Sequence, residues 1–166
     1  LLTGNYHNFF GKLFYSNKIK DFEKIINSLK NNFKDRVYFE IQRHNENEEI
    51  NFENHLLKYS KILSIPLIAT QEVFYLDNDM HEAHDALICI GEKNFVDDKN
   101  RFRYSNQHYL KNEEELLNLY SDMPEALENN YNFHLRFNYK PKKSKPILPS
   151  IANAQSNSPE EELAKQ

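Results

Sequence analysis

The fold is decided by Val37-Tyr38-Phe39-Glu40-Ile41, by the segment at about 50–63, and by Pro66-Leu67-Ile68-Ala69-Thr70. The first stretch is rich in β-branched and aromatic residues, which favours a strand. The third is a short apolar run, as in a strand that is buried on both faces. The segment between them carries apolar residues at helical spacing. This order predicts two parallel neighbouring strands joined by a right-handed helical crossover.

The residues on either side of this unit are predicted to be mainly helical. Apolar residues recur at steps of three and four over 18–33, and residues 6–15 favour a shorter amphipathic helix. Residues 92–109 lack a periodic pattern and are expected to be irregular. Three later helix starts carry a capping pair or an early proline: Asp79 with Glu82 before a helix that Gly91 ends, Asn112 with Glu115, and Pro124. Helices that alternate with strands predict an α/β fold.

Composition limits the possible classes of protein. A chain of 166 residues, with 39% hydrophobic residues, 12 Phe and 10 Tyr, suits one folded domain or a piece of a larger one. A net charge of −4 argues against a surface that coats nucleic acid, and three glycines are too few for a glycine-rich phosphate loop. No apolar run is long enough to span a membrane. The one cysteine, Cys89, is expected to be a small core residue in a cytoplasmic protein.

The chain divides into three parts by composition. Residues 1–138 are predicted to be the folded part, 139–157 a linker rich in Lys and Pro and then in Ser and Asn, and 158–166 the start of a truncated helix. The basic segment at 140–146 is interpreted as linker, with contact to a phosphate backbone as the alternative. The chain begins with Leu1 instead of Met, which favours a fragment.

The ends of the two predicted strands are the places where functional groups are expected. In parallel α/β folds such groups gather at the carboxyl ends of the strands. The first strand leads to His44 and the second to Glu72, and an imidazole with a carboxylate is a suitable pair of ligands for a divalent metal. The alternative, which the residues alone favour, is that both are ordinary loop residues.

A second candidate is the pair His81 and His84, which a spacing of three places on one helical face. Their spacing differs from the four-residue spacing of the zinc-protease helix, and Glu82 is explained by helix capping. We therefore expect a structural role for the pair. His84 is expected to be the more buried and to bond a backbone carbonyl or a carboxylate, on a helix capped by Asp79. The core side of that helix is predicted to consist of Ala86, Leu87 and Ile90.

Longer strings resemble the alpha subunits of bacterial DNA polymerase III. Val37–His44 is similar to the family strand YxELQRHG, and Ile65–Tyr75 to the strand (I/L)PLVATNEVxF. Met80–Gly91 resembles the family helix EAHDALLCI. The resemblance continues, in the family's order and with matching gaps, through the start Leu1–Gly4 and the segments Tyr104–Tyr109, Glu113–Leu116 and Asp122–Asn129. Together these strings cover about residues 1–135.

The resemblance implies the carboxyl-terminal half of a polymerase and histidinol phosphatase (PHP) domain. Such a domain is a distorted TIM-like barrel of parallel strands and crossover helices, followed here by a helical segment. The parent protein would be a DNA-directed DNA polymerase, a nucleotidyltransferase that uses Mg²⁺, DNA and deoxynucleotides and works with other replisome subunits in the cytoplasm, away from membranes. The family's amino-terminal HxH motif and its polymerase aspartates lie outside this sequence. The chain itself is therefore expected to hold no catalytic residue and no cofactor.

The family's metal positions transfer only in part. His44 matches a position that contributes a ligand, and Glu72 matches the acidic residue of a D-x-H pair. The histidine of that pair corresponds to Phe74, which cannot bind a metal. The resemblance thus implies a degenerate site whose remnant positions are His44 and Glu72. Nucleic-acid contacts are not assigned.

Three functions are consistent with these observations. The favoured one is a structural PHP-domain segment of a replicative polymerase. The first alternative is an active metal-dependent phosphoesterase or 3′–5′ exonuclease, against which Phe74 counts. The second alternative is a free-standing interaction module, supported only by the linker-like tail.

Overall fold

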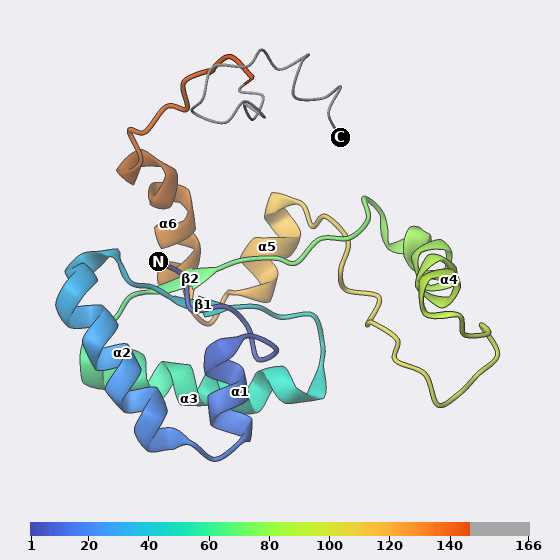
Figure 1. Ribbon diagram of the computed structural model, residues 1–166, viewed down its shortest axis with the longest axis horizontal. Helices are drawn as coiled ribbons and strands as arrows, with labels where there is room; N and C mark the ends of the chain where they lie inside the picture. Colours follow the sequence, from blue (N-terminus) through green and yellow to red (C-terminus); the bar gives the residue numbers. More distant parts are fainter. Residues whose placement is uncertain (147–166) are drawn as a thin grey trace, which may run out of the picture. The chain divides into compact units, whose positions relative to one another are not determined.

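The computed structural model describes residues 1–146 of the chain (Figure 1). Residues 1–136 form one compact unit, and residues 137–146 have neither helix nor strand. The helices are α1 (Phe9–Tyr15), α2 (Ile19–Phe33), α3 (Asn47–Leu63), α4 (His81–Glu92), α5 (Glu113–Leu119) and α6 (Pro124–Phe133). The strands are β1 (Phe39–Ile41) and β2 (Leu67–Ala69), and short 3-10 turns lie at Lys34–Arg36, Asn78–Met80 and His134–Arg136.

The predicted parallel pair is confirmed. Strand β1 is hydrogen-bonded to β2 in parallel, with Phe39 beside Leu67 and Ile41 beside Ala69. Both strands are buried, since each is covered by helices: α3 contacts β1, and α6 packs against β2. In Figure 1, α6 lies on one side of the strands and α1, α2 and α3 lie on the other. This mixed arrangement of helices and a parallel strand pair agrees with the predicted α/β class, whereas the partial TIM-like barrel stays a prediction.

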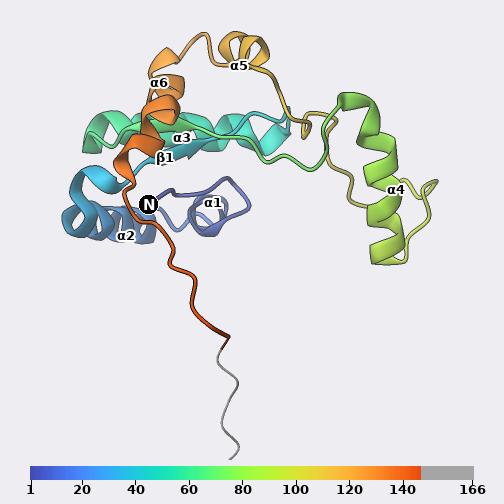
Figure 2. The same ribbon diagram turned by 90° about the horizontal axis from the view of Figure 1, so that it is seen from above.

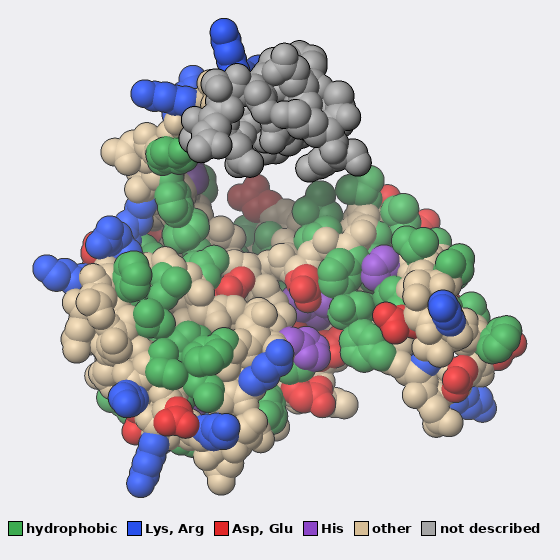
Figure 3. All heavy atoms as spheres, viewed as in Figure 1, with side chains coloured by type: hydrophobic (Ala, Val, Ile, Leu, Met, Phe, Trp, Pro, Cys, Tyr) green, Lys and Arg blue, Asp and Glu red, His purple; other side chains and the backbone are tan. Residues whose placement is uncertain are grey.

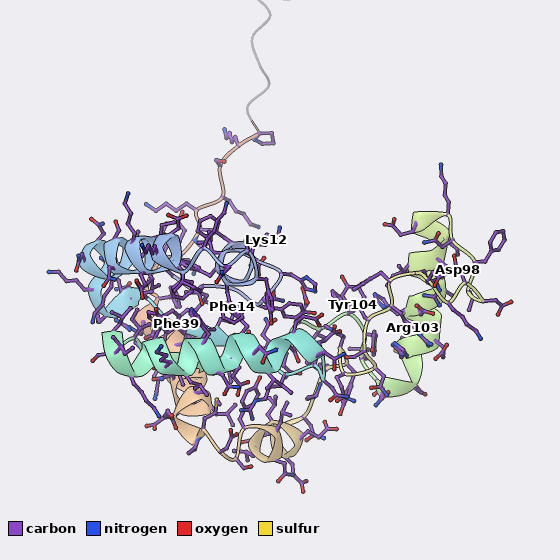
Figure 4. All side chains as sticks on the ribbon, turned by 90° about the horizontal axis from the view of Figure 1, so that it is seen from below. Lys12, Phe14, Phe39, Asp98, Arg103 and Tyr104 are labelled. Atoms are coloured by element: carbon purple, nitrogen blue, oxygen red, sulfur yellow. The ribbon has the colours of Figure 1, made fainter. Side chains whose placement is uncertain are left out.

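Aromatic side chains fill the space between the strands and the helices below them. Phe22 of α2 is fully buried. The centroid of its ring lies 5.3 Å from the centroid of the Phe10 ring and 6.5 Å from that of the Phe39 ring. The view from below places Phe39 between α2 and α3 (Figure 4). The core positions of α2 and α3 have the spacing predicted from the sequence: Phe22 and Ile26 on α2, and Phe52, Leu56 and Tyr59 on α3.

One edge of the sheet is occupied by the first residues of the chain. The backbone N–H of Thr3 donates to the Tyr38 carbonyl at 3.2 Å, and the N–H of Tyr38 donates to the Leu1 carbonyl at 2.9 Å. Gly4 then turns away with φ +79°, a left-handed conformation that favours glycine, and its N–H reaches the Glu40 carboxylate at 3.0 Å. The segment before α1 thus continues the sheet beyond β1.

The other edge is occupied by two asparagines of α6. In a parallel ladder the backbone N–H and C=O groups of alternate residues point to opposite edges of the strand. The backbone groups of Pro66 and Thr70 bond to β1, so those of the residues between them alternate from this side. The carbonyls of Leu67 and Ala69 therefore face outward. The side-chain amide of Asn129 donates to the first at 2.8 Å, and that of Asn130 donates to the second at 2.8 Å. These bonds dock α6 on the open edge of β2.

Of the three helix starts predicted after residue 76, those of α5 and α6 are confirmed. Asn112 and Glu115 form a capping box at the start of α5, because each side chain accepts from the other's backbone N–H, at 3.0 and 2.8 Å. Pro124 is the first residue of α6, as predicted. No helix among the described residues has the length and apolar character needed to cross a membrane.

The predicted start and orientation of α4 are wrong. Asp79 lies in the preceding 3-10 turn and makes no capping bond. The core side of α4 is formed by Asp85 and Cys89, while Leu87 is 65% and Ile90 76% exposed. The physical reason is a buried ion pair: the Arg101 guanidinium bonds the Asp85 carboxylate at 2.6 and 2.5 Å and draws that face of the helix inward.

The edge contacts of α6 lead to a test of stability. Replacing both Asn129 and Asn130 with Ala leaves the Leu67 and Ala69 carbonyls without these donors, so the free energy of unfolding should fall by about 1–3 kcal/mol. Urea denaturation measures the change. The matched control is Asn132→Ala, an exposed asparagine on the same helix, which should change stability by less than about 0.5 kcal/mol. Equal effects of the two changes would contradict the assigned role.

Candidate functional site

His44 lies just after β1, is 3% exposed, and uses both of its ring nitrogens. The backbone N–H of Glu72 donates to Nε2 at 3.1 Å, so Nε2 must be the acceptor. The proton of the neutral ring is then on Nδ1, which donates to the Glu49 carboxylate at 2.9 Å. The other oxygen of Glu49 accepts from the His44 backbone N–H at 2.7 Å. Within the described structure, His44 is thus held on two sides.

Glu49 also explains where α3 begins. Its carboxylate accepts from the backbone N–H of Glu46 at 3.1 Å, which is the reciprocal bond of a capping box. The helix therefore begins at Asn47, three residues before the predicted start at about 50. The same carboxylate thus caps the helix and orients His44, so the start of α3 and the end of β1 are fixed together.

His108 is a site residue that reasoning from composition and spacing missed. Its ring stacks on His44 with centroids 4.1 Å apart and planes within 4° of parallel. Its Nδ1 donates to the Glu72 carbonyl at 3.0 Å. One imidazole therefore accepts from the Glu72 backbone and the other donates to it. The Tyr104–Tyr109 string contained the signal, but its irregular spacing gave no reason to expect it beside His44.

Phe74 and His84 extend the stack. The Phe74 ring lies 4.9 Å from that of His108 and 5.1 Å from that of His84, with planes within 20° and 9° of parallel. We call His44, His108, Phe74 and His84 the ring column. Figure 3 shows histidine side chains gathered between the part of the molecule that carries α1 to α3 and the helix α4. Two strand ends, the 104–109 loop and α4 thus meet at this column.

The predicted hydrogen bond of His84 is wrong, and His81 makes one instead. Nδ1 of His84 is buried without a hydrogen-bond partner among the described residues, and the face of that ring is stacked on Phe74. Nε2 of His81 instead bonds the Tyr104 carbonyl at 2.9 Å. Both residues are intermediate in burial, and the predicted structural role fits both. Figure 4 shows Tyr104 in the segment that crosses between α3 and α4.

A second carboxylate, Glu46, connects the 104–109 loop to the amino-terminal segment. It accepts from the Tyr6 hydroxyl at 3.0 Å and from the Ser105 backbone N–H at 3.2 Å. The Ser105 hydroxyl in turn donates to the His44 carbonyl. Nε2 of His108 faces Glu46 at 3.5 Å without a hydrogen bond. Burial, together with the neighbouring His44, holds the pKa of His108 below its ordinary value.

Arg43, next to His44, fixes the helices α5 and α6. Its guanidinium makes two bonds to Glu53, at 2.9 and 2.6 Å, and two to Asp122, at 2.7 and 2.8 Å. It also lies 5.0 Å from the centre of the Tyr120 ring. The bonds to Asp122 and Glu53 raise the pKa of Arg43, so it stays charged. This is a structural clamp between α3 and the turn before α6.

The residues at the strand ends do not fit a metal ion in this arrangement. Both nitrogens of His44 are already hydrogen-bonded, and Glu72 takes part through its backbone. The hydrocarbon ring of Phe74 fills the space between His108 and His84. Within residues 1–146, no group of three or more His, Cys, Asp or Glu side chains is placed to hold a metal. What the arrangement does is hold three chain segments together.

The buried His108 leads to a prediction on pH dependence. Its pKa is lowered in the folded state, so the unfolded chain binds more protons below the ordinary value of 6.5. Stability should therefore be full above about pH 6.5 and should fall as the pH drops through that value. His108→Phe keeps a ring in the column but cannot titrate, so its stability should be lower overall and depend less on pH between about 7.5 and 5.5.

Denaturation at a series of pH values measures both slopes. The control is His7→Phe, which makes the same His-to-Phe replacement at an exposed position. It should keep the pH slope of the unmodified chain. If His108→Phe also kept that slope, the buried imidazole would not be the group responsible.

The chain is similar, over 70 to 100% of its length, to three curated bacterial proteins. It is 36% identical over 142 residues to the DNA polymerase III subunit alpha of Rickettsia bellii, which covers 86% of this chain and 12% of that protein. It is 32% identical over all 166 residues to the DNA polymerase III subunit alpha of Caulobacter vibrioides, and the match covers 14% of that protein. The subunit of Pseudomonas fluorescens is 40% identical over 119 residues, which are 70% of this chain and 10% of the relative.

The curated relatives are much longer than this chain. A scan against models of protein families finds no match. The chain spans about one eighth of the length of the curated relatives quoted first. The chain is therefore homologous to, and corresponds to a segment of, the bacterial DNA polymerase III alpha subunits.

Proposed function

We propose that this chain is the carboxyl-terminal part of a PHP domain within a replicative DNA-directed DNA polymerase. The full-length protein adds deoxynucleotides to a primer on a DNA template, with Mg²⁺ held by residues outside this chain. The proposal is supported by relatives named DNA polymerase III subunit alpha that match up to the whole length of the chain. DNA, deoxynucleotides and other replisome subunits are the proposed partners, and the cytoplasm is the proposed location.

The domain boundaries follow from this proposal. Residues 1–138 belong to the distorted TIM-like barrel of the PHP domain, 139–157 to the linker, and 158–166 to a helix that leads toward the polymerase core. The parallel β1–β2 pair and the compact unit that ends at Arg136 support the first boundary. The residues from 147 onward lie outside the described part of the chain.

The role proposed for the segment itself is structural, and the ring column carries this proposal. His44 and Glu72 are remnants of metal positions that now orient the backbone at the end of β2. Phe74 stands where a ligand would be needed and packs between two imidazoles. Because both ring nitrogens of His44 are already hydrogen-bonded and Phe74 cannot bind a metal, the proposed role includes no catalytic residue in this segment. An active phosphoesterase or 3′–5′ exonuclease is the competing function, favoured only by the closeness of His44 and Glu72.

The polymerase assignment is tested on the full-length polypeptide that carries this segment. The purified protein should extend a primer on a DNA template with all four deoxynucleotides and Mg²⁺. Chelation of Mg²⁺ should abolish extension. A protein that binds DNA but extends no primer under these conditions would contradict the assignment.

The structural role of His44 is tested with the variant His44→Ala. This variant removes the Nδ1–H donor of the Glu49 carboxylate, which is only 7% exposed, and the acceptor of the Glu72 backbone N–H, so the free energy of unfolding should fall by about 2–4 kcal/mol. Bound Zn²⁺ and Mn²⁺, measured by mass spectrometry of the metals, should be the same in the variant and the unmodified protein. His7→Ala serves as the control for loss of an exposed imidazole.

Two results would overturn the structural interpretation. The first is stoichiometric Zn²⁺ or Mn²⁺ in the unmodified protein that is lost in His44→Ala. The second is metal-dependent degradation of single-stranded DNA from its 3′ end that both His44→Ala and Glu72→Gln abolish. The first would show that the metal site is intact, and the second would establish the competing exonuclease function.

A further inference from the structure

Positive and negative charges are separated along the last third of the sequence. Residues 112–128 contain six acidic residues and neither Lys nor Arg. Residues 129–159 contain no Asp or Glu, and their five basic residues are Arg136, Lys140, Lys142, Lys143 and Lys145. The net charge of −4 for the whole chain therefore conceals a local excess of positive charge.

Four of these five positive charges have no acidic partner in the described part of the chain. Arg136 is the exception, because its guanidinium pairs with the Asp35 carboxylate at 2.5 Å. We define the basic segment as residues 140–145. Its four lysines are all exposed, and within residues 1–146 none of them forms an ion pair or a hydrogen bond. Their charges are thus available to a partner.

The basic segment has the form of an extended chain. Figure 2 shows neither helix nor strand in the described residues after Arg136. Pro141 lies within the segment and Pro146 follows it, and proline favours an extended backbone of about 3.1 Å per residue. At that rise the segment spans about 16 Å. Duplex DNA carries one negative charge per about 1.7 Å, so the same length offers about nine phosphates.

The composition of the basic segment favours a nucleic acid over a protein as its partner. Besides lysine it contains only Pro141 and Ser144, so it has no large apolar side chain to bury against a protein surface. Lysine is depleted at protein–protein interfaces. Lysine contacts to phosphate, in contrast, supply most of the sequence-independent affinity of proteins for DNA.

We propose that the four lysines of the basic segment bind the phosphate backbone of the DNA on which the full-length protein acts. This rests on the proposed function, which supplies DNA as the partner. The lysines would hold the polypeptide on DNA without selecting a base sequence, because contacts to phosphate carry no sequence information. The proposal adds a DNA contact to a segment whose proposed role is otherwise that of a linker.

The experiment compares two variants of the full-length polypeptide with the unmodified protein. In the first, all four lysines of the basic segment are replaced with Gln. The matched control replaces four exposed lysines on and beside α1 and α2 with Gln, which removes the same charge: Lys12, Lys18, Lys20 and Lys24. Fluorescence anisotropy measures binding of a primer–template duplex, and of the template strand alone, over a series of salt concentrations.

The first variant should bind DNA more weakly and with less dependence on salt. Each phosphate contact adds about 0.9 to the slope of log affinity against log salt concentration on duplex DNA, and about 0.7 on a single strand. Four lost contacts should therefore reduce the slope by about 3 to 4, and the affinity at about 0.1 M salt should fall at least tenfold. The control should keep the slope of the unmodified protein.

A reduced slope with either form of DNA supports the proposal, and the form that shows it identifies the bound strand. Unchanged binding of both forms would overturn it, as would equal losses in the first variant and the control. Unchanged DNA binding with loss of an acidic replisome subunit would mean that the partner is a protein.

Primer extension at saturating DNA separates this proposal from the polymerase assignment. The first variant should extend the primer as fast as the unmodified protein, because the lysines would add affinity and take no part in the chemistry. Failure of the unmodified protein to extend a primer would contradict the polymerase assignment. The salt slopes alone decide whether the basic segment binds DNA.

Discussion

Two stacked imidazoles both form hydrogen bonds with the backbone of Glu72, and the rest of the site depends on this contact. His44 comes from the end of β1 and accepts from the Glu72 N–H, while His108 comes from a distant loop and donates to the Glu72 carbonyl. Both rings are buried, so an unmade bond would leave a polar group without water. The requirement to pair these groups fixes the loop against both strand ends.

Around that contact, carboxylates link the surrounding segments. Glu49 joins the start of α3 to His44, and Glu46 joins Tyr6 to Ser105. Asp85 plays the same part for α4 through Arg101. Each of these acids satisfies more than one donor or meets a guanidinium, which is the condition under which a carboxylate is stable in a partly buried position. The site is therefore a set of structural junctions.

The fold followed from local patterns where periodicity was strong. The strands around Phe39 and Ile68, the core face of α2, and the starts of α5 and α6 were all predictable, since burial and capping act over a few residues. The orientation of α4 was not. Its apolar residues occupy two sides, and the buried ion pair of Asp85 with Arg101 decides which side faces inward.

The sequence by itself determined the parallel strand pair, its helical crossover segment, the relation to DNA polymerase III alpha subunits, and His44 and Glu72 as neighbours at the strand ends. Only the tertiary structure decided that His108 and Phe74 complete the column and that Asn129 and Asn130 occupy the edge of β2. The reason is physical: periodicity and capping report on neighbours along the chain. A stacked ring or an edge hydrogen bond depends on residues from distant segments, whose meeting is fixed only when the whole core packs.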